Sequence, residues 1–111
     1  MIEQGDLLLV PFPFSDQSGR KVRPVIVISN NEFNERSEDF IVVSVTSNIS
    51  RDKYTLPLTI SDMAEGKLFT VCCIKVENIL KIDKELIINK IGKVKKDKIN
   101  NILDILINIL S

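Results

Sequence analysis

The sequence predicts a mainly β fold, a small antiparallel β-barrel followed by one C-terminal α-helix. Short apolar segments recur at close spacing between residues 7 and 94 and are separated by Gly, Pro and polar residues, which is typical of a small all-β domain. From Asp97 onward the apolar residues recur at spacings of three and four, which is the period of a helix. A chain of 111 residues has the length of one domain, so we expect a single unit over 1–111.

The first expected strand covers residues 7–10, where the run Leu-Leu-Leu-Val lies between Gly5-Asp6 and Pro11. The chain stays extended over 12–14, because Pro13 disfavours a helical conformation at Phe12. A polar loop follows over 15–21, and an acidic, solvated loop with room for a helical turn covers 30–39. The remaining strands are expected at 25–28, 40–46, 54–60, 69–77 and 86–94.

The C-terminal helix is more apolar than one buried face requires. We expect Asp97 to be its N-cap, just as we expect Asp83 to cap one helical turn that ends at Leu86. One side of the helix can pack on the barrel, and the rest forms an exposed apolar patch of the size of an interface. We therefore expect a homodimer. The apolar stripe consists of Ile99, Ile102, Leu103, Leu106 and Leu110, widened by Ile105, Ile107 and Ile109.

The composition excludes several classes of function. Lys+Arg and Asp+Glu both number 15, so the net charge is zero and any nucleic-acid site depends on locally concentrated positive charge. The chain has no His, which excludes serine-protease-like triads and most zinc sites. No run approaches the ~20 apolar residues that span a bilayer, and the N-terminus does not resemble a signal peptide. We expect no metal, no cofactor and no membrane contact.

Cys72 and Cys73 are the only cysteines. Neighbours on a strand point to opposite faces, so they are not expected to form an ordinary disulfide with each other. We expect one of them in the core and one facing outward, and neither as a catalytic thiol, because no partner base is in evidence. The absence of a disulfide framework favours a reducing cytoplasm.

Arg23 is the strongest candidate site residue. Pro24 restricts its backbone to an extended conformation, and the basic loop residues 19–21 precede it, so its planar guanidinium can receive a phosphate. The alternative is an ordinary surface charge at a strand start. Thr46, Lys75 and Glu77 lie on the mixed faces of other expected strands and can line a site with Arg23. We interpret the lysines at 90, 93, 95, 96 and 98 as a solvated hairpin and helix start, rather than as an RNA-steering patch.

Five blocks of sequence resemble a known family. The opening Gly5-Asp6-Leu7-Leu8-Leu9-Val10-Pro11-Phe12 is followed by Gly19-Arg20-Lys21-Val22-Arg23-Pro24-Val25-Ile26-Val27-Ile28-Ser29. The strand that ends in Val45-Thr46-Ser47 comes next, and Ile79-Leu80-Lys81-Ile82-Asp83-Lys84-Glu85-Leu86 with Ile91-Gly92-Lys93-Val94 completes the pattern. Together they resemble the MazF/PemK toxins of bacterial type II toxin–antitoxin systems over nearly the whole chain.

The resemblance implies a fold and an activity. The fold is an SH3-like small barrel with a C-terminal helix, generally a homodimer. The activity is metal-independent, sequence-selective cleavage of single-stranded RNA, mainly messenger RNA, which leaves a 2′,3′-cyclic phosphate and a 5′-hydroxyl. A cognate antitoxin neutralises the toxin by occupying the substrate groove.

The resemblance also places the site residues. The essential Arg before Pro falls on Arg23 and the strand-end Thr on Thr46, while Lys75 and Glu77 fall on a family Arg and a family acid. Arg23 would stabilise the phosphorane, Thr46 would bind a phosphate oxygen or the 2′-hydroxyl, and Glu77 is the candidate base. By position, the expected RNA contacts are Phe14, Asp16, Gln17, Lys21 and Asn48, with Arg51 and Lys53 on phosphates.

Two other classes of function stay open. A non-catalytic small-barrel module could hold RNA or a peptide in its groove, and the replacement of Arg by Lys75 keeps this alternative. The CcdB-type gyrase poisons resemble the same architecture, but they act through a C-terminal Trp-Gly-Ile end. This chain ends in Ile109-Leu110-Ser111 and contains no Trp, which argues against that mode.

Overall fold

The computed structural model describes residues 2–11, 22–49, 52–68 and 70–111. The expected extended segment 12–14 and the expected RNA contacts Phe14, Asp16, Gln17, Lys21 and Arg51 lie outside these residues. The elements in order are β1 (Asp6–Pro11), β2 (Val22–Val27), α1 (Asn31–Arg36), β3 (Asp39–Thr46), β4 (Thr55–Leu58), η1 (Ile60–Asp62), β5 (Met63–Gly66), β6 (Cys72–Asp83), η2 (Lys84–Leu86), β7 (Asn89–Val94) and α2 (Lys96–Leu110).

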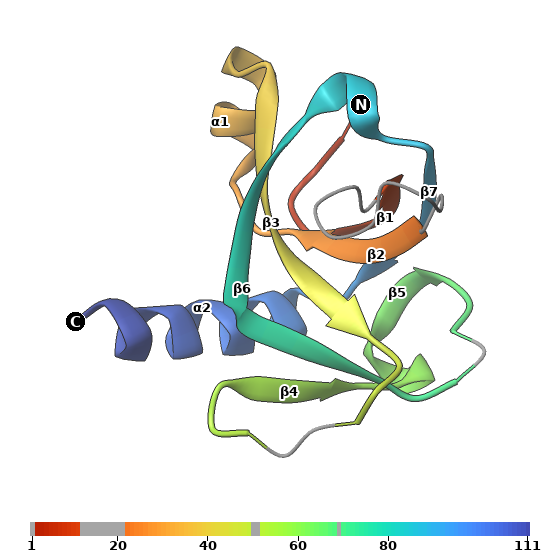
Figure 1. Ribbon diagram of the computed structural model, residues 1–111, viewed down its shortest axis with the longest axis vertical. Coiled ribbons are helices and arrows are strands. Elements are labelled where there is room, and N and C mark those ends of the chain that lie inside the picture. The colour runs from red at the N-terminus through yellow and green to blue at the C-terminus, as the bar shows by residue number, and fades with distance from the viewer. Residues whose placement is uncertain (1, 12–21, 50–51, 69) are drawn as a thin grey trace.

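The strands of the described residues form one seven-stranded antiparallel sheet that curls into a half-barrel with α2 beside it (Figure 1). Its order is β4-β6-β3-β2-β1-β7-β5. The mainly β fold with a C-terminal helix is therefore confirmed. The helical turn after Asp83 is also confirmed as η2, because the Asp83 carboxylate accepts a hydrogen bond of 2.8 Å from the Glu85 N–H.

Both faces of the central strands are buried. Alternate residues of β1, β2 and β3 enter two separate cores, so these strands are apolar almost throughout. The first core lies against α2 and includes Leu7, Ile26, Val43, Ile74 and Ile102. The second core lies on the opposite face of these strands and consists of Leu8, Val10, Val25, Val27, Phe40, Val42 and Ile82.

A wide bulge divides β6 into two halves. Lys75 pairs with Ser44 of β3, but the next pair along β3 is Val43 with Ile79. Residues 76–78 therefore have no partner on β3, and β6 bends sharply at this point (Figure 1). The first half of β6 pairs with β3 and β4, and the second half continues along β3 to Asp83.

Several element boundaries differ from the sequence expectations. The expected strand 54–60 is shorter, because the chain turns into η1 after Leu58, and β5 was not expected at all. The acidic segment 30–39 contains α1, whose N-terminus is capped by the Asn30 side chain. The buried Asn34 bonds to Ser29 and holds this helix on the body.

Asp97 is not the N-cap of α2. The helix starts one residue after Lys95, whose N–H donates to the Asp62 carbonyl at 2.8 Å, so a backbone contact sets the start. Asp97 instead lies in the first turn, where its charge suits the helix dipole. Lys98 is buried, and its ammonium donates to the Pro57 carbonyl at 3.1 Å and lies 3.3 Å from an Asp62 carboxylate oxygen.

The expectation of one buried and one outward cysteine is wrong. Cys72 and Cys73 are both buried and both free of disulfides. Cys72 belongs to the first core, and Cys73, on the other face of β6, is 2% exposed, so both faces of the strand are covered at this point. Burial is the main cause that raises the pKa of the Cys72 thiol, and the charge of the neighbouring Cys73 thiolate adds to it. A thiolate at Cys72 is therefore disfavoured.

Among the described helices, none is both long enough and apolar enough to cross a membrane.

Candidate active site

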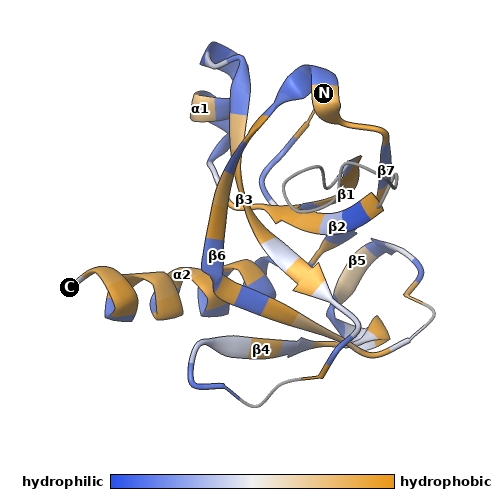
Figure 2. Ribbon diagram, viewed as in Figure 1, coloured by the Kyte–Doolittle hydropathy of each residue, from blue (hydrophilic) through white to orange (hydrophobic). Residues whose placement is uncertain are grey.

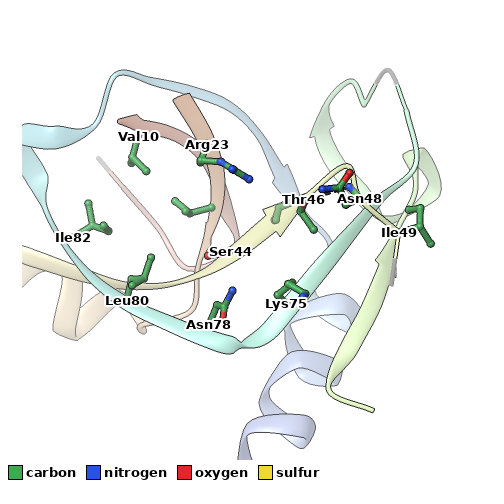
Figure 3. A pocket seen from close by; sticks show the side chains of 12 residues that line it. Val10, Arg23, Ser44, Thr46, Asn48, Ile49, Lys75, Asn78, Leu80 and Ile82 are labelled. Carbon is green, nitrogen blue, oxygen red and sulfur yellow. Dashed lines mark hydrogen bonds between the residues drawn. The ribbon is translucent and has the colours of Figure 1, made fainter. Parts of the chain in front are cut away.

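A pocket of about 230 Å³ opens where the second core meets the edges of β2, β3 and β6 (Figure 3). Most of its apolar lining belongs to that core. It consists of Val10, Val25 and Ile82, together with Leu80, which packs against the core. Its polar lining is gathered from three strands and the turn after β3. The polar residues are Arg23, Ser44, Thr46, Asn48, Lys75 and Asn78.

Arg23 enters the pocket from β2. It pairs with Val10 of β1, and Pro24 follows it, so its backbone is held extended within the sheet. Val25 pairs with Ser44, and alternate residues of a strand share a face, so Arg23 and Thr46 lie on the same face as that pair. The structure therefore brings together the two residues that the resemblance placed first.

Thr46 is the last residue of β3, and its hydroxyl is oriented by the turn that follows. The Asn48 N–H donates to Thr46 Oγ1 at 3.1 Å. This bond uses a lone pair of the oxygen and leaves the hydroxyl proton to be donated into the pocket. Asn48, another predicted contact, also lines the pocket.

Lys75 lies across from Ser44 in the β3–β6 register and reaches the same pocket. Its ammonium lies 3.9 Å from a carboxylate oxygen of Asp52, whose side chain is largely exposed. None of the lining residues in the described part of the chain is acidic, so Arg23 and Lys75 make the pocket locally cationic. A chain of zero net charge thus concentrates positive charge at one place.

Glu77 is not among the residues that line the pocket, and it is exposed. Regular alternation along β6 would put Glu77 on the same face as Lys75, but the bulge at 76–78 breaks the alternation. Asn78 lines the pocket instead, a residue that the sequence did not single out. Lys53 also lies outside the lining, with its ammonium 5.4 Å from the centroid of the Tyr54 ring.

The expectation of a solvated lysine-rich segment 90–98 is confirmed for the exposed Lys95 and Lys96, whereas the other three lysines lie close to carboxylates. Lys90 lies 3.3 Å from the fully buried Asp6, and Lys93 bonds to Glu3 at 2.7 Å. Together with the buried Lys98–Asp62 pair, these contacts neutralise most of the segment. This pairing lowers the net positive charge of the segment, in line with the interpretation that it is not an RNA-steering patch.

Within the described ranges, no three His, Cys, Asp or Glu side chains are grouped so as to hold a metal ion.

The chain matches a family and several solved structures over nearly its full length. Residues 3–110 match the family described as PemK-like, MazF-like toxin of type II toxin–antitoxin system. An endoribonuclease MazF of Staphylococcus epidermidis is 32% identical over 111 residues, which covers 95% of this chain and 90% of that protein.

Two solved structures share the fold at lower identity. An endoribonuclease from a mycobacterial species, solved in complex with its cognate antitoxin, superposes with a TM-score of 0.81 at 18% identity, covering 99% of this chain and 95% of that one. A MazE–MazF structure from Deinococcus radiodurans gives a TM-score of 0.76 at 15% identity, covering 98% and 95%. With a full-length family match and a relative at 32% identity, the chain belongs to the PemK-like, MazF-like toxins of type II toxin–antitoxin systems.

Proposed function

We propose that this protein is a metal-independent endoribonuclease that cleaves single-stranded RNA, mainly messenger RNA, at a short recognition sequence in the cytoplasm. The observation that carries the proposal is the pocket in which Arg23, Thr46 and Lys75 meet without an acidic lining residue among those described. Such a pocket suits the negative charge that develops on a phosphate during transesterification. The 32% identical endoribonuclease supports the same activity.

The proposed reaction needs neither a metal nor a covalent enzyme intermediate. The ribose 2′-oxygen attacks the adjacent phosphorus in line with the bond to the 5′-oxygen. The 2′-hydroxyl loses its proton to a base, the P–O5′ bond breaks, and the leaving oxygen gains a proton. The products are a 2′,3′-cyclic phosphate and a 5′-hydroxyl. Arg23 and Lys75 stabilise the phosphorane, and the Thr46 hydroxyl donates to one of its non-bridging oxygens.

Glu77 remains the candidate general base for this reaction. It lies outside the pocket-lining residues, on the exposed bulge of β6, so this role requires that the attacking 2′-hydroxyl lie at the rim of the pocket. If Glu77 accepts the proton, Glu77→Gln abolishes the acidic limb of the pH–rate profile. An unchanged profile would remove it from the mechanism and leave Arg23, Thr46 and Lys75 as the acting groups.

Cleavage of a long single-stranded RNA in EDTA tests the proposal. The wild-type protein is expected to cut at one short motif and to leave cyclic-phosphate ends. Arg23→Ala is expected to slow cleavage by about 10²–10³-fold, the cost of losing one charge-stabilising donor. Arg36→Ala is the matched control, because Arg36 is an exposed arginine on α1 that pairs only loosely with Glu32 at 4.0 Å. Intact RNA after incubation with folded wild-type protein would overturn the proposal and favour a binding module.

We further propose that a cognate antitoxin neutralises this protein by covering the same pocket. A mycobacterial relative and a Deinococcus relative of the same fold were each solved together with an antitoxin. One equivalent of the antitoxin is expected to stop cleavage and to compete with RNA for binding. Inhibition that leaves RNA binding intact would contradict a shared site.

A homodimer is part of the same proposal. Apolar residues continue along α2 to its C-terminal end (Figure 2), where Ile107 and Leu110 are 61% and 75% exposed. These two residues do not belong to the first core, which α2 contacts through Leu106 and Ile109 on its other side. Sedimentation at micromolar concentration is expected to give a dimer, and Leu110→Glu to weaken it. A wild-type monomer under these conditions would contradict the proposal.

A further inference from the structure

The pocket has two ends of different chemistry. Arg23, Thr46 and Lys75 gather towards one end, and the apolar residues Val10, Leu80 and Ile82 form the other (Figure 3). Ser44 and Asn78 lie between the two ends. A nucleotide has the same division, because its phosphate is charged and the faces of its base are apolar.

The apolar end is an unfilled extension of the second core. Val10, Val25 and Ile82 are each 2% exposed, so the protein has already removed most of this surface from water. The half-buried Leu80 is the apolar lining residue at this end that a flat, weakly polar group can cover on entering. A nucleobase is such a group, and a pocket of about 230 Å³ can admit one.

Asn78 reaches the pocket only because of the bulge in β6. The register passes from Ser44–Lys75 to Val43–Ile79, so residues 76–78 leave the regular alternation. The bulge places an amide between the cationic and the apolar ends (Figure 3). Bulges of this kind re-aim a side chain next to a site, at the cost of ladder hydrogen bonds.

The polar groups at this boundary form no side-chain hydrogen bond with the residues that the structure describes. Among the described residues, neither the Asn78 amide nor the Ser44 hydroxyl takes part in a side-chain hydrogen bond, whereas Thr46, Lys75 and Arg23 all have interactions. Asn78 is exposed and Ser44 is half-buried, so both groups are open to solvent in the free protein. Their donors and acceptors are thus available to a ligand that occupies the apolar end.

We propose that Asn78, supported by Ser44, reads the hydrogen-bonding edge of the base next to the scissile phosphate. The inference rests on the proposed function and assigns a specificity-determining residue to it. The base lies against the apolar end while its phosphate faces Arg23 and Lys75. The carboxamide offers a donor and an acceptor side by side, and it can therefore pair with a base edge through two bonds.

Cleavage of a random-sequence single-stranded RNA, with the new ends sequenced, tests this assignment. Wild-type protein is expected to show a base preference at a position next to the cut. Asn78→Ala is expected to reduce discrimination at that one position by about 10-fold, as the loss of a bidentate base contact does, and to leave the other positions unchanged. Ser44→Ala is expected to reduce base discrimination at the same position by a smaller factor. Asn101→Ala, an exposed asparagine on α2, is the matched control.

Asn78→Asp gives the sharper version of the test. A carboxylate accepts hydrogen bonds but donates none, so preference at the same position is expected to move towards bases with an exocyclic amino group. Unchanged base frequencies in Asn78→Ala, or an equal loss at every position, would overturn the assignment. A thermal unfolding curve that matches wild type shows that the variants are folded.

The failure of the proposed function can be told apart from the failure of this inference. If the wild-type protein cleaves no RNA, the same variants are compared for binding to a set of short oligoribonucleotides that differ at one base. A ranking of affinities that changes with Asn78→Ala supports base reading by a non-catalytic module. A ranking that stays the same overturns the inference independently of catalysis.

Discussion

The pocket and the lysine-rich segment 90–98 both contain basic side chains, but their surroundings are opposite. In the segment, Lys90, Lys93 and Lys98 face carboxylates at 3.3, 2.7 and 3.3 Å. In the pocket, Arg23 and Lys75 share a lining with no acidic member among the described residues, and the ammonium of Lys75 lies 3.9 Å from a carboxylate oxygen of the exposed Asp52.

The comparison shows that basic density in the sequence does not locate a phosphate site. Five lysines within nine residues are the most basic stretch of the chain, yet three of them pair with carboxylates and hold the N-terminal strand and α2 on the sheet. Two cations that lie far apart in the sequence make the site, because the sheet register brings them to one face. Local net charge, rather than the number of lysines, is what attracts a polyanion.

The largest effect outside the pocket is expected at Lys98. Lys98→Met keeps much of the apolar stem but removes the bonds to the Pro57 carbonyl and the Asp62 carboxylate. Losing hydrogen bonds of a charged group at a buried site is expected to lower the free energy of unfolding by about 2 kcal/mol. Urea unfolding measures this change, and Lys96→Met on the exposed side of the same helix is the control. RNA cleavage per folded molecule is expected to stay at the wild-type rate. A loss of cleavage would contradict the purely structural role of Lys98.

Lys75 is expected to show the reverse behaviour. Lys75→Ala is expected to weaken RNA cleavage by about 10-fold and to reduce the slope of log binding constant against log salt by about 0.7, the value for one phosphate of a single strand. Stability is expected to change little, since its ion pair with Asp52 is partly exposed. Lys93→Ala, measured beside it, should leave both RNA parameters unchanged. Equal effects of the two substitutions on the salt slope would contradict the division between the two regions.

A smaller effect is expected in the pH dependence of stability. Burial acts to raise the pKa of Asp62, but the Thr59 N–H and the Lys98 ammonium outweigh it and hold this pKa below its ordinary value of 3.8. A carboxyl with a lowered folded-state pKa stabilises the fold above its unfolded pKa, and the contribution is lost as the pH falls through the folded pKa. Asp62→Asn is therefore expected to be less stable than wild type at about pH 6 and to approach wild-type stability below about pH 3. A constant difference at both pH values would contradict this origin.

Much of the fold could be predicted from the sequence because the apolar segments are clear. The strands at β1, β2 and β3, the capped turn after Asp83 and the terminal helix all follow from local pattern. The start of α2 could not be predicted, since the Asp62 carbonyl contact with Lys95 N–H is non-local and no residue pattern records it. Strand β5, only four residues long and mostly exposed, carries no periodic signal.

The site was predictable only in part. Arg23, Thr46, Lys75 and Asn48 all line the pocket, and the Arg-Pro pair and the strand-end Thr were visible as motifs. Asn78 was not predictable, because simple alternation along β6 places Glu77 on the same face as Lys75. The bulge instead brings Asn78 into the pocket lining and leaves Glu77 outside it. Ser44 did carry a signal, since it lies two residues before Thr46 on the same strand face.

The most direct test of the account is to locate bound RNA on the protein by NMR. A short oligoribonucleotide with a 2′-deoxyribose at the cleavage site binds without being cut, and it can be titrated into isotope-labelled wild-type protein. The account predicts the largest shifts in Arg23, Ser44, Thr46, Lys75 and Asn78, with little change over residues 90–98. Shifts that concentrate on the lysine-rich segment and leave the pocket unchanged would contradict it.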